Sequence, residues 1–322
     1  MATVREIAEQ AGVGVGTASR ALKGSGYVSE GKKQRILAAA ERLGYVPREA
    51  AVRRQSGGTV GVVLPDVSLP FYGNYLKYVQ LELENAGYRT MIFNTLGQRQ
   101  RVAETFRMLS EKRLNGLIVN ADVTEEELAL ADAGRVVSFE RMLGAQIPLV
   151  ASDHKRGGRL AAKLLIASGC KNVMIIGARH HTPVYADIRI DECRSMLKKW
   201  KIPVTGVEIA GEDYGFQSCC ELISEYLDRY PWVDGIFTDD VEAYCALSQA
   251  KKRGIRVPGD LKIVGYDGNE ITRMIEPQVT TIAQNMPMLA RISVEVLLKR
   301  MDGRETEQRY LIPVQIQKGG TT

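Results

Sequence analysis

Three hydrogen-bonding side chains, Thr17, Ser19 and Arg20, lie within four positions of one another near the N-terminus. Two hydroxyls and a guanidinium at this spacing are suited to phosphate oxygens and to the edges of bases. We expect residues 3–22 to form two short helices joined by a tight turn, which would place these three side chains against DNA. The first chemistry that the sequence indicates is therefore DNA recognition.

Local signals define the helices that would position these side chains. Thr3 followed by Glu6 is a capping box, so a helix should begin at Val4, and Gly12 occupies the position where a left-handed residue ends it. A second helix should run over 15–22 with Gly14 as its N-cap, and a third over 29–43, closed by Gly44. The expected apolar faces are Val4, Ile7, Ala8 and Ala11, then Ala18, Ala21 and Leu22, then Ile36, Leu37, Ala40 and Leu43.

The glycines of this segment imitate another motif. Gly12, Gly14 and Gly16 spell GxGxG, which in a dinucleotide-binding loop follows a strand. The preceding residues, 5–11, have the pattern of an amphipathic helix instead. We therefore set the nucleotide-binding interpretation aside.

The basic charge is concentrated in the same region. The 322 residues carry a net charge of +5, and residues 1–56 hold ten Lys and Arg against five Asp and Glu, which leaves 33 of each sign in the rest of the chain. A basic module on a neutral body is the electrostatic footprint of DNA binding. A solvated basic surface is the alternative, and the helix pattern favours the first interpretation.

Composition indicates two or three domains of an ordinary soluble protein. No stretch approaches the roughly 18 apolar residues of a membrane helix, and the N-terminus has no apolar signal region, so we expect a cytoplasmic protein without membrane contact. The five cysteines form no CxxC pair and are odd in number, which favours reduced thiols.

From Thr59 onward, strand and helix patterns alternate, which predicts parallel sheets with helices on both faces. A second unit of the same kind begins near Leu149. The expected fold is thus an all-α helix-turn-helix headpiece followed by an α/β body of two doubly wound parallel sheets, a bilobed clamshell.

Ligands of doubly wound sheets bind outside the carboxyl ends of the strands. That rule selects a set of polar and aromatic residues: Asp66, Ser68, Phe71, Tyr72, Asn94, Asn120, Glu140, Asp153, Asp239, Asp240 and Asp267. Strand-end capping, salt bridges between lobes and, for Phe71 and Tyr72, core packing are the alternatives.

Catalytic patterns are not found in the sequence. It has no nucleophile elbow, phosphate loop or HExxH. His180 and His181 lack ligand spacing around them and are expected in a surface loop, and His154 is expected to be structural. We expect no enzyme activity, no cofactor and no metal.

The motifs TVREIAEQAGV, TASRAL and YVSEGKKQRILAAAERLGYVP resemble the DNA-binding headpiece of the LacI/GalR (lactose-repressor/galactose-repressor) family of bacterial transcriptional regulators. The resemblance extends to about residue 317. It implies a headpiece over 1–47, a hinge helix and linker over 48–58, and a periplasmic-binding-protein-like sensor over 59–322. The chain would cross between lobes near 150, 280 and 310, giving lobe 1 about 59–150 and 281–310, and lobe 2 about 151–280 and 311–317.

In that family the second helix lies in the major groove, and its opening residues, here Val15 and Gly16, read bases. Neither side chain donates a hydrogen bond, although Val15 can meet a thymine methyl group. Arg20 then becomes the best candidate for a bidentate guanine contact, with Thr17 and Ser19 on phosphates or base edges. Thr3 is counted with the DNA-contacting residues, while Lys32, Lys33 and Arg35 are either phosphate contacts or solvated.

The family's hinge helix enters the minor groove with a leucine wedge. Here Ala51 would approach the groove floor, and Arg54 stands where the leucine is expected, beside Arg53. Two alternatives remain open. The arginines bind a narrow groove by charge with less kinking, or the wedge is absent and binding is weaker.

The family also assigns effector contacts. Arg189 falls where it carries an effector-holding arginine, Asp239 and Asp240 fall on its Asn-Asp pair, and Asp267 on a common effector contact. Carboxylates and a guanidinium around Phe71 and Tyr72, with Ser68 and Glu140, would suit vicinal hydroxyls.

The expected function is a repressor that binds a near-palindromic operator as a homodimer under control of a sugar-like effector. No leucine heptads follow residue 317, which favours a dimer over a tetramer. The competing classes are a sugar-binding receptor without a transcriptional role and an enzyme on a Rossmann-like scaffold.

Overall fold

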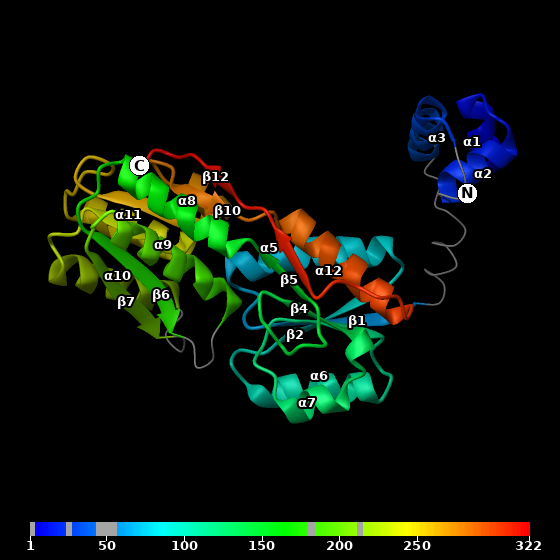
Figure 1. The fold of residues 1–322 in the computed structure, drawn as a ribbon, viewed down its shortest axis with the longest axis horizontal. Helices are drawn as coiled ribbons and strands as arrows, with labels where there is room; N and C mark the ends of the chain where they lie inside the picture. Colours follow the sequence, from blue (N-terminus) through cyan, green and yellow to red (C-terminus); the bar gives the residue numbers. More distant parts are fainter. Residues whose placement is uncertain (1–3, 24–27, 43–56, 180–183, 211–214) are drawn as a thin grey trace. The chain divides into compact units, whose positions relative to one another are not determined.

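The structure is a computed structural model that describes residues 4–23, 28–42, 57–179, 184–210 and 215–322. The chain divides into two compact units (Figure 1). Residues 1–59 and 83–89 form the first unit, and residues 60–82 and 90–322 form the second. Within the first unit, the Arg89 backbone N–H donates to the Gly58 carbonyl and its guanidinium donates to the Gly57 carbonyl.

The first unit contains a three-helix headpiece of α1 (Val4–Ala11), α2 (Val15–Lys23) and α3 (Glu30–Arg42). Helix α1 ends at Gly12, which has a left-handed φ of +63°, as its position in the sequence predicted. Helix α2 opens on the Gly14 carbonyl, which accepts from Thr17 and Ala18. The three helices bury one small core of Ile7, Ala8, Ala11, Ala18, Ile36, Ala39 and Ala40.

One residue that the sequence pattern places in the headpiece core does not lie there. Leu37 is 48% exposed, and Ala39 is buried in its place. The third helix thus presents Ile36, Ala39 and Ala40 to the headpiece core. Thr3, Leu43 and Gly44 lie outside the described residues.

The first sheet of the body has the strand order β11-β5-β4-β3-β1-β2. Its strands are β1 (Thr59–Leu64), β2 (Arg89–Asn94), β3 (Gly116–Val119), β4 (Val136–Phe139), β5 (Leu149–Ser152) and β11 (Arg309–Ile312). Its helices are α5 (Pro70–Asn85), α6 (Arg99–Ser110), α7 (Glu125–Leu130) and α12 (Met286–Met301), with the 3-10 turn η1 (Ala133–Arg135). Phe106, Leu109, Leu117 and Val136 share a core on the α6 side, while α12 packs on β3, β4 and β5.

The second sheet has the order β12-β10-β9-β8-β6-β7. Its strands are β6 (Val173–Arg179), β7 (Val204–Ala210), β8 (Gly235–Phe237), β9 (Lys262–Asp267), β10 (Thr280–Ala283) and β12 (Gln315–Gln317). Its helices are α8 (His154–Ala167), α9 (Ile188–Lys199), α10 (Phe216–Arg229) and α11 (Asp240–Lys252), with turns η2 (Tyr185–Asp187) and η4 (Glu270–Arg273). Met174 and Ile176 pack toward α10 and α11, whereas Val173 and Ile175 pack toward α8 and α9, so helices cover both faces.

The prediction of two parallel sheets needs one correction. Strand β12 runs antiparallel to β10, with Thr281 opposite Gln317. The chain returns to the second sheet after β11 and runs back along the edge of β10. A short edge strand of this kind carried no periodic signal in the sequence.

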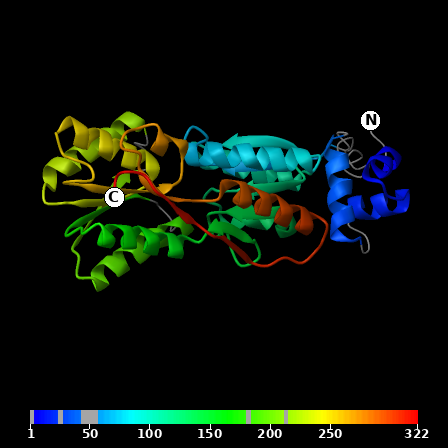
Figure 2. The ribbon, with the colours of Figure 1, turned by 90° about the horizontal axis from the view of Figure 1, so that it is seen from above.

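The chain passes between the two sheets after β5, after β10 and after β11 (Figure 2). Strand β5, over 149–152, had been expected to open the second unit, but it pairs with β4 and β11 in the first sheet. The first crossing therefore follows Ser152. The apolar run of β5 fits either sheet, and only its neighbours decide the assignment.

The prediction of reduced thiols is also wrong for two of the five cysteines. Cys220 on α10 and Cys245 on α11 form a disulfide, with their Cα atoms 4.9 Å apart. Cys170, Cys193 and Cys219 are free and buried. The packing of α10 against α11 brings the pair within bridging distance, which the sequence spacing does not reveal.

No helix within the described residues is both long enough and apolar enough to cross a membrane.

Helices α8 and α9 cross unusually closely at Gly158. A Cβ built on this glycine would lie 2.1 Å from the Arg189 carbonyl oxygen, which is backbone and cannot turn aside. The missing side chain therefore lets the start of α9 lie directly against α8.

We predict that Gly158→Ala destabilises the body by at least about 2 kcal/mol, because an added methyl group must push two helices apart. The melting temperature should fall by roughly 4–8 °C, measured by differential scanning fluorimetry. Gly215→Ala is the control, because its Cβ would meet its nearest neighbour at an ordinary 3.7 Å and φ at this position is −72°. Equal melting temperatures for the two variants would contradict the close crossing.

Candidate functional sites

Helix α2 presents an outer face that is free of the headpiece core. Ala18 is fully buried, whereas Val15, Gly16 and Arg20 are exposed. The Arg20 Nε donates to the Gly16 carbonyl at 3.3 Å, so its stem lies along the helix and its guanidinium remains at the surface. Thr17 and Ser19 flank this face and are half-buried. The face therefore displays the donors that the sequence singled out.

Three further cations lie at the surface of the headpiece. Lys32, Lys33 and Arg35 on α3 are all exposed. The remaining predicted DNA contacts, Thr3, Ala51, Arg53 and Arg54, lie outside the described residues, so the hinge and its missing leucine stay a prediction.

A second polar site lies at the carboxyl ends of the strands of the body. Arg189, in the first turn of α9, donates from one nitrogen to both carboxylate oxygens of Asp239, at 2.7 and 2.8 Å. Its guanidinium also lies 4.7 Å from the centroid of the Tyr266 ring. Both bonds come from the same guanidinium nitrogen of Arg189. Its other two nitrogens therefore make no hydrogen bond to Asp239.

The two aspartates after β8 have different roles. Asp239 precedes α11 and pairs with Arg189, whereas Asp240 is fully buried. Its carboxylate accepts from the Thr281 hydroxyl at 2.6 Å and from the Asn269 backbone N–H at 2.6 Å. Asp240 thus anchors the start of α11 to β10 and η4, and it holds Asp239 in place.

Asp267 ends β9 with a left-handed φ of 111° and accepts from the Gln284 amide at 2.7 Å. Burial raises the pKa of Asp267 well above its ordinary value, and the neighbouring Asp239 and Asp240 raise it further. Burial likewise raises the pKa of Asp240. Burial works to lower the pKa of Arg189, but Asp239 and Asp267 outweigh it, so the pKa rises and the guanidinium stays charged.

Glu140 and His154 connect the two halves of the body. Glu140, at the end of β4 with φ +58°, accepts from the Ser152 backbone N–H and bonds to His154 Nε2. The other ring nitrogen of His154 bonds to the Tyr266 hydroxyl at 2.9 Å. A second link joins the Ser152 hydroxyl to the Gln284 side chain. Residues next to the crossings therefore tie the polar site to both sheets.

The first sheet and its helix α5 contribute aromatic side chains to the surroundings of the polar network. Phe71 stacks on Phe139 with ring centroids 5.8 Å apart and meets Tyr72 edge-on at 5.0 Å. Burial raises the pKa of Tyr72; Arg141 and Arg189 lower it in part, whereas Asp267 and Glu140 raise it further. Tyr72 therefore lies within electrostatic reach of charged groups from both sheets.

The structure gathers most of the predicted effector residues. Tyr72, Glu140, Arg189, Asp239 and Asp267 belong to one network, and Phe71 supports Tyr72 from behind. Ser68 is exposed, and its backbone N–H donates to the Asp66 carboxylate at 2.9 Å. Asn94 and Asp153 serve local structure, because Asn94 accepts from Val67 and Asp153 caps α8. His154 has the structural role that the sequence indicated.

Sequence reasoning missed Tyr266 and Gln284 as members of this network. Each stands beside a strand end, since Tyr266 precedes Asp267 in β9 and Gln284 directly follows β10. Applying the strand-end rule to β10 would have found Gln284. Tyr266 had no signal beyond its place in an apolar strand.

The three-helix headpiece and the body of two Rossmann-like sheets together define a DNA-binding protein with a periplasmic-binding-protein-like body. The model of the bacterial regulatory proteins of the lacI family matches residues 3–48, and that of the periplasmic binding protein-like domain matches residues 162–322.

Full-length relatives agree with these matches. The chain is 30% identical to the sucrose operon repressor of Streptococcus mutans, over 99% of each chain. It is also 30% identical to the ribose operon repressor of Halalkalibacterium halodurans, over 100% of this chain and 97% of the relative.

A solved structure has the same fold as the body. It is a periplasmic binding protein/LacI transcriptional regulator from Alkaliphilus metalliredigens complexed with D-xylulofuranose, 25% identical, with a TM-score of 0.72 over 82% of this chain and 98% of that one. The chain belongs to the lacI family of bacterial regulatory proteins, and it is a DNA-binding transcriptional regulator.

The raised pKa of Asp267 leads to a prediction about pH. A carboxyl whose pKa is higher in the folded than in the unfolded state stabilises the fold fully only below the unfolded pKa, and that contribution is lost as the pH rises through the folded pKa. Asp267→Asn keeps the shape of the side chain, and asparagine tolerates the positive φ of this position. The melting temperature of the variant minus that of the wild type should therefore rise from pH 5 to pH 8 without ligand.

Asp260→Asn is the matched control for this series. Arg256 lowers the pKa of Asp260 to about 2, so its contribution is fully present above the unfolded value and is lost only as the pH falls through about 2. Its melting difference should stay flat from pH 5 to pH 8. A flat series for Asp267→Asn as well would mean that its carboxyl is not penalised by burial.

Proposed function

We propose that this regulator is a repressor that binds a near-palindromic operator as a homodimer and responds to a sugar or sugar derivative. The observation that carries the proposal is the Arg189–Asp239 pair over Tyr266, with Asp267 and Tyr72 beside it, at the strand ends of both sheets. Relatives named as sucrose and ribose operon repressors support the ligand class.

The chemistry of the network suits a polyhydroxylated ligand. Asp239 and Asp267 supply acceptors, the guanidinium of Arg189 supplies donors, and Tyr72 and Tyr266 supply flat apolar surface. Neighbouring hydroxyls on a sugar ring can donate to a carboxylate and accept from a guanidinium at once. The C–H face of such a ring matches the aromatic side chains.

Dimerisation through the first sheet's edge is part of the proposal. Leu81 on α5, Met91 and Ile92 on β2, and Leu96 just beyond it are between 38% and 51% exposed. An edge strand that exposes apolar side chains is a surface that soluble proteins normally cover. A second copy of the chain would cover it symmetrically, which also matches a two-fold operator.

The proposal includes no catalytic role for the network. Both ring nitrogens of the buried His154 are engaged, by Glu140 and by Tyr266, so this imidazole has no nitrogen directed at a ligand. Arg189 and Asp239 neutralise each other.

A sugar-binding receptor without a transcriptional role is the second candidate, and the exposed face of α2 argues against it. A gel-shift experiment with DNA from the protein's own operon separates the two.

The first prediction of the proposal concerns Arg20. Replacing it by alanine removes the candidate guanine contact, worth roughly 1–3 kcal/mol, so operator affinity should fall about 5- to 150-fold. Affinity for random duplex of the same length should change little. Fluorescence anisotropy at physiological ionic strength measures both.

Lys33→Ala removes a charge from the same unit and serves as the control. Any loss it causes should be equal on operator and random DNA, with a shallower salt dependence. If Arg20→Ala also weakened both DNAs equally, its assignment as a base reader would fail.

The second prediction concerns Arg189. A thermal-shift screen against sugars, sugar acids and nucleosides should find a ligand that raises the melting temperature, because a ligand bound only by the native fold stabilises it. Arg189→Ala should abolish that shift and leave operator binding intact. Its unliganded melting temperature should also fall, because Asp239 loses its counter-charge.

Arg194→Ala is the control on the same helix, since Arg194 pairs with Asp191 at the surface. This variant should keep the ligand-induced shift. Loss of operator binding together with the shift in Arg189→Ala would show that Arg189 supports the fold rather than the ligand.

A further inference from the structure

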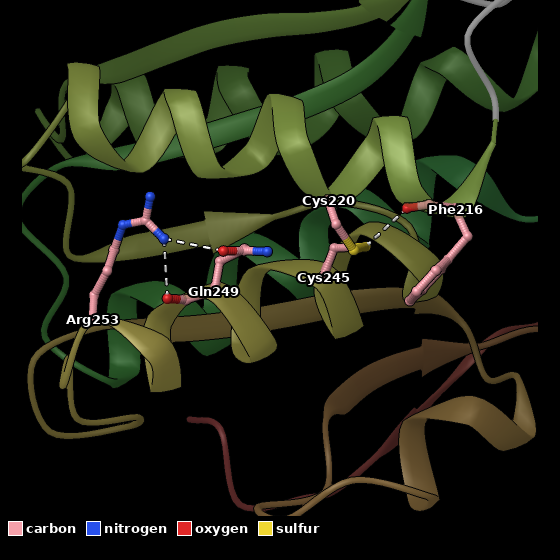
Figure 3. Close-up of a disulfide and its surroundings, with 5 residues drawn as sticks. All are labelled: Phe216, Cys220, Cys245, Gln249 and Arg253. Atoms are coloured by element: carbon pink, nitrogen blue, oxygen red, sulfur yellow. Dashed lines mark hydrogen bonds between the residues drawn. A yellow bond between two sulfur atoms is a disulfide. The ribbon is translucent and has the colours of Figure 1, made fainter.

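The disulfide between Cys220 and Cys245 lies between two helices of the second sheet (Figure 3). Cys220 is in the second turn of α10 and is half-buried, whereas Cys245 on α11 is fully buried. The bond thus has one end that solvent reaches and one that it does not. An incoming sulfur compound would meet Cys220 first.

The three free cysteines differ from this pair. Burial raises the pKa of Cys170 to about 11 and that of Cys219 to about 12, and it raises the pKa of Cys193 as well. The thiolate is the reactive form of cysteine, so these thiols are poorly reactive at neutral pH. Cys220 is the one cysteine of the five that is not buried, so oxidation chemistry would begin there, and the buried Cys245 would react only through its contact with Cys220.

Besides the apolar core that it shares with α10, helix α11 is linked to α10 by a polar cluster near one end and by the disulfide in the other half. At its C-terminal end, Arg253 donates to the Asp228 carboxylate at 2.8 and 2.9 Å and to the Ser224 hydroxyl at 2.7 Å. Arg253 also bonds to Gln249, as Figure 3 shows. The disulfide is the covalent attachment of the other half, five residues after the helix begins at Asp240.

The half of α11 that the disulfide holds is also the half that enters the polar network. Asp239 caps this end and pairs with Arg189, and Asp240 anchors it through Thr281 and Asn269. Breaking the sulfur bond would leave the Arg253 attachment in place. It would remove the covalent link only from the segment that positions Asp239.

We propose that Cys220 and Cys245 form a reversible thiol-oxidation site whose co-reactant is a low-molecular-weight disulfide, and that its oxidation state sets how firmly the N-terminal half of α11 is held. The consequence for effector affinity, acting through Asp239, rests on the proposed function. The oxidation chemistry and the stiffening of α11 do not.

The oxidation balances in two exchange steps. The Cys220 thiolate attacks one sulfur of the small disulfide, forms a mixed disulfide and releases one small thiolate. The Cys245 thiolate then attacks the Cys220 sulfur, forms the internal bond and releases the second small thiolate. The two protein thiols lose two protons and two electrons in total, and the small disulfide is reduced to two thiols.

Reduction follows the reverse path. The external thiolate attacks the accessible Cys220 sulfur, and Cys245 leaves. Its sulfur lies 3.8 Å from the Phe216 carbonyl oxygen, which provides an acceptor for the regenerated buried thiol. In the reduced state the Cys245 thiol could therefore donate a hydrogen bond to the Phe216 carbonyl oxygen.

The test uses the full-length chain without DNA or effector. It is equilibrated in oxidised glutathione or in excess reduced glutathione, and the linkage is read by non-reducing peptide mapping. Hydrogen exchange is then compared for residues 240–246 and 247–252. The oxidised protein should show the 220–245 link, slower exchange over 240–246, unchanged exchange over 247–252, and a melting temperature higher by on the order of 5–10 °C.

Two variants sharpen the result. Cys220→Ser should behave like the reduced wild type in both buffers. Asp228→Asn weakens the Arg253 attachment instead, so it should speed exchange over 247–252 in both buffers and keep the response of 240–246 to oxidation.

Three outcomes would overturn the proposal. They are a link from Cys245 to a cysteine other than Cys220, a bond that reduced glutathione cannot open without unfolding the chain, and identical exchange of 240–246 in both buffers. None of these measurements depends on a ligand or an operator, so failure of the proposed function would leave this result standing.

Discussion

The ion pair between Arg189 and Asp239 is the contact around which the polar network of the body is arranged. A guanidinium with a side chain only 12% exposed needs a counter-charge, and Asp239 supplies it. The pair lies among two further carboxyls, Asp240 and Asp267, whose pKa values are raised by burial. An anionic ligand would add negative charge beside Asp239, Asp240 and Asp267. A ligand rich in hydroxyl groups adds no charge and can both donate and accept hydrogen bonds, and this is the physical reason for favouring a neutral sugar over an anion.

The same network joins the two sheets of the body, so a ligand bound there, as proposed, would act on both. Glu140, Ser152 and Tyr72 come from the first sheet, and His154, Tyr266 and Gln284 lie with the second or at its crossings. Contacts that join two lobes are sensitive to any rotation between them, so a ligand with different contacts in two arrangements shifts their populations. Arg89, the first residue of β2, in turn holds Gly57 and Gly58 by hydrogen bonds. The segment that leads toward the headpiece is thus attached to an edge strand of the first sheet.

Sequence patterns predicted the parts of this protein that depend on local order. The helix starts at Val4 and Val15, the left-handed Gly12 and the alternation of strands and helices all follow from spacing and turn chemistry. The strand-end rule brought Arg189's partners Asp239 and Asp267 to notice because carboxyl ends of parallel strands meet at one edge. The assignment of β5 to a sheet, the reversed β12 and the exposed Leu37 depend on packing between distant segments. The Cys220–Cys245 bond has the same origin, because 25 residues of chain separate its ends.

Gly16 shows how the structure can separate the demands of folding from those of binding. A Cβ built on it meets nothing within 4 Å, and its φ is not in the left-handed range. The headpiece fold therefore accepts any ordinary residue there, and glycine costs helix stability compared with alanine. Gly16 lies on the exposed face of α2, one turn before Arg20. A glycine at this position therefore suggests a role in binding rather than in folding. Without a side chain, the start of the helix could approach the floor of the major groove more closely, which would bring the predicted base contacts Val15 and Arg20 nearer to base edges. In this family member, recognition would then rest on Arg20 and on close backbone approach rather than on a pair of donor side chains at the start of the helix.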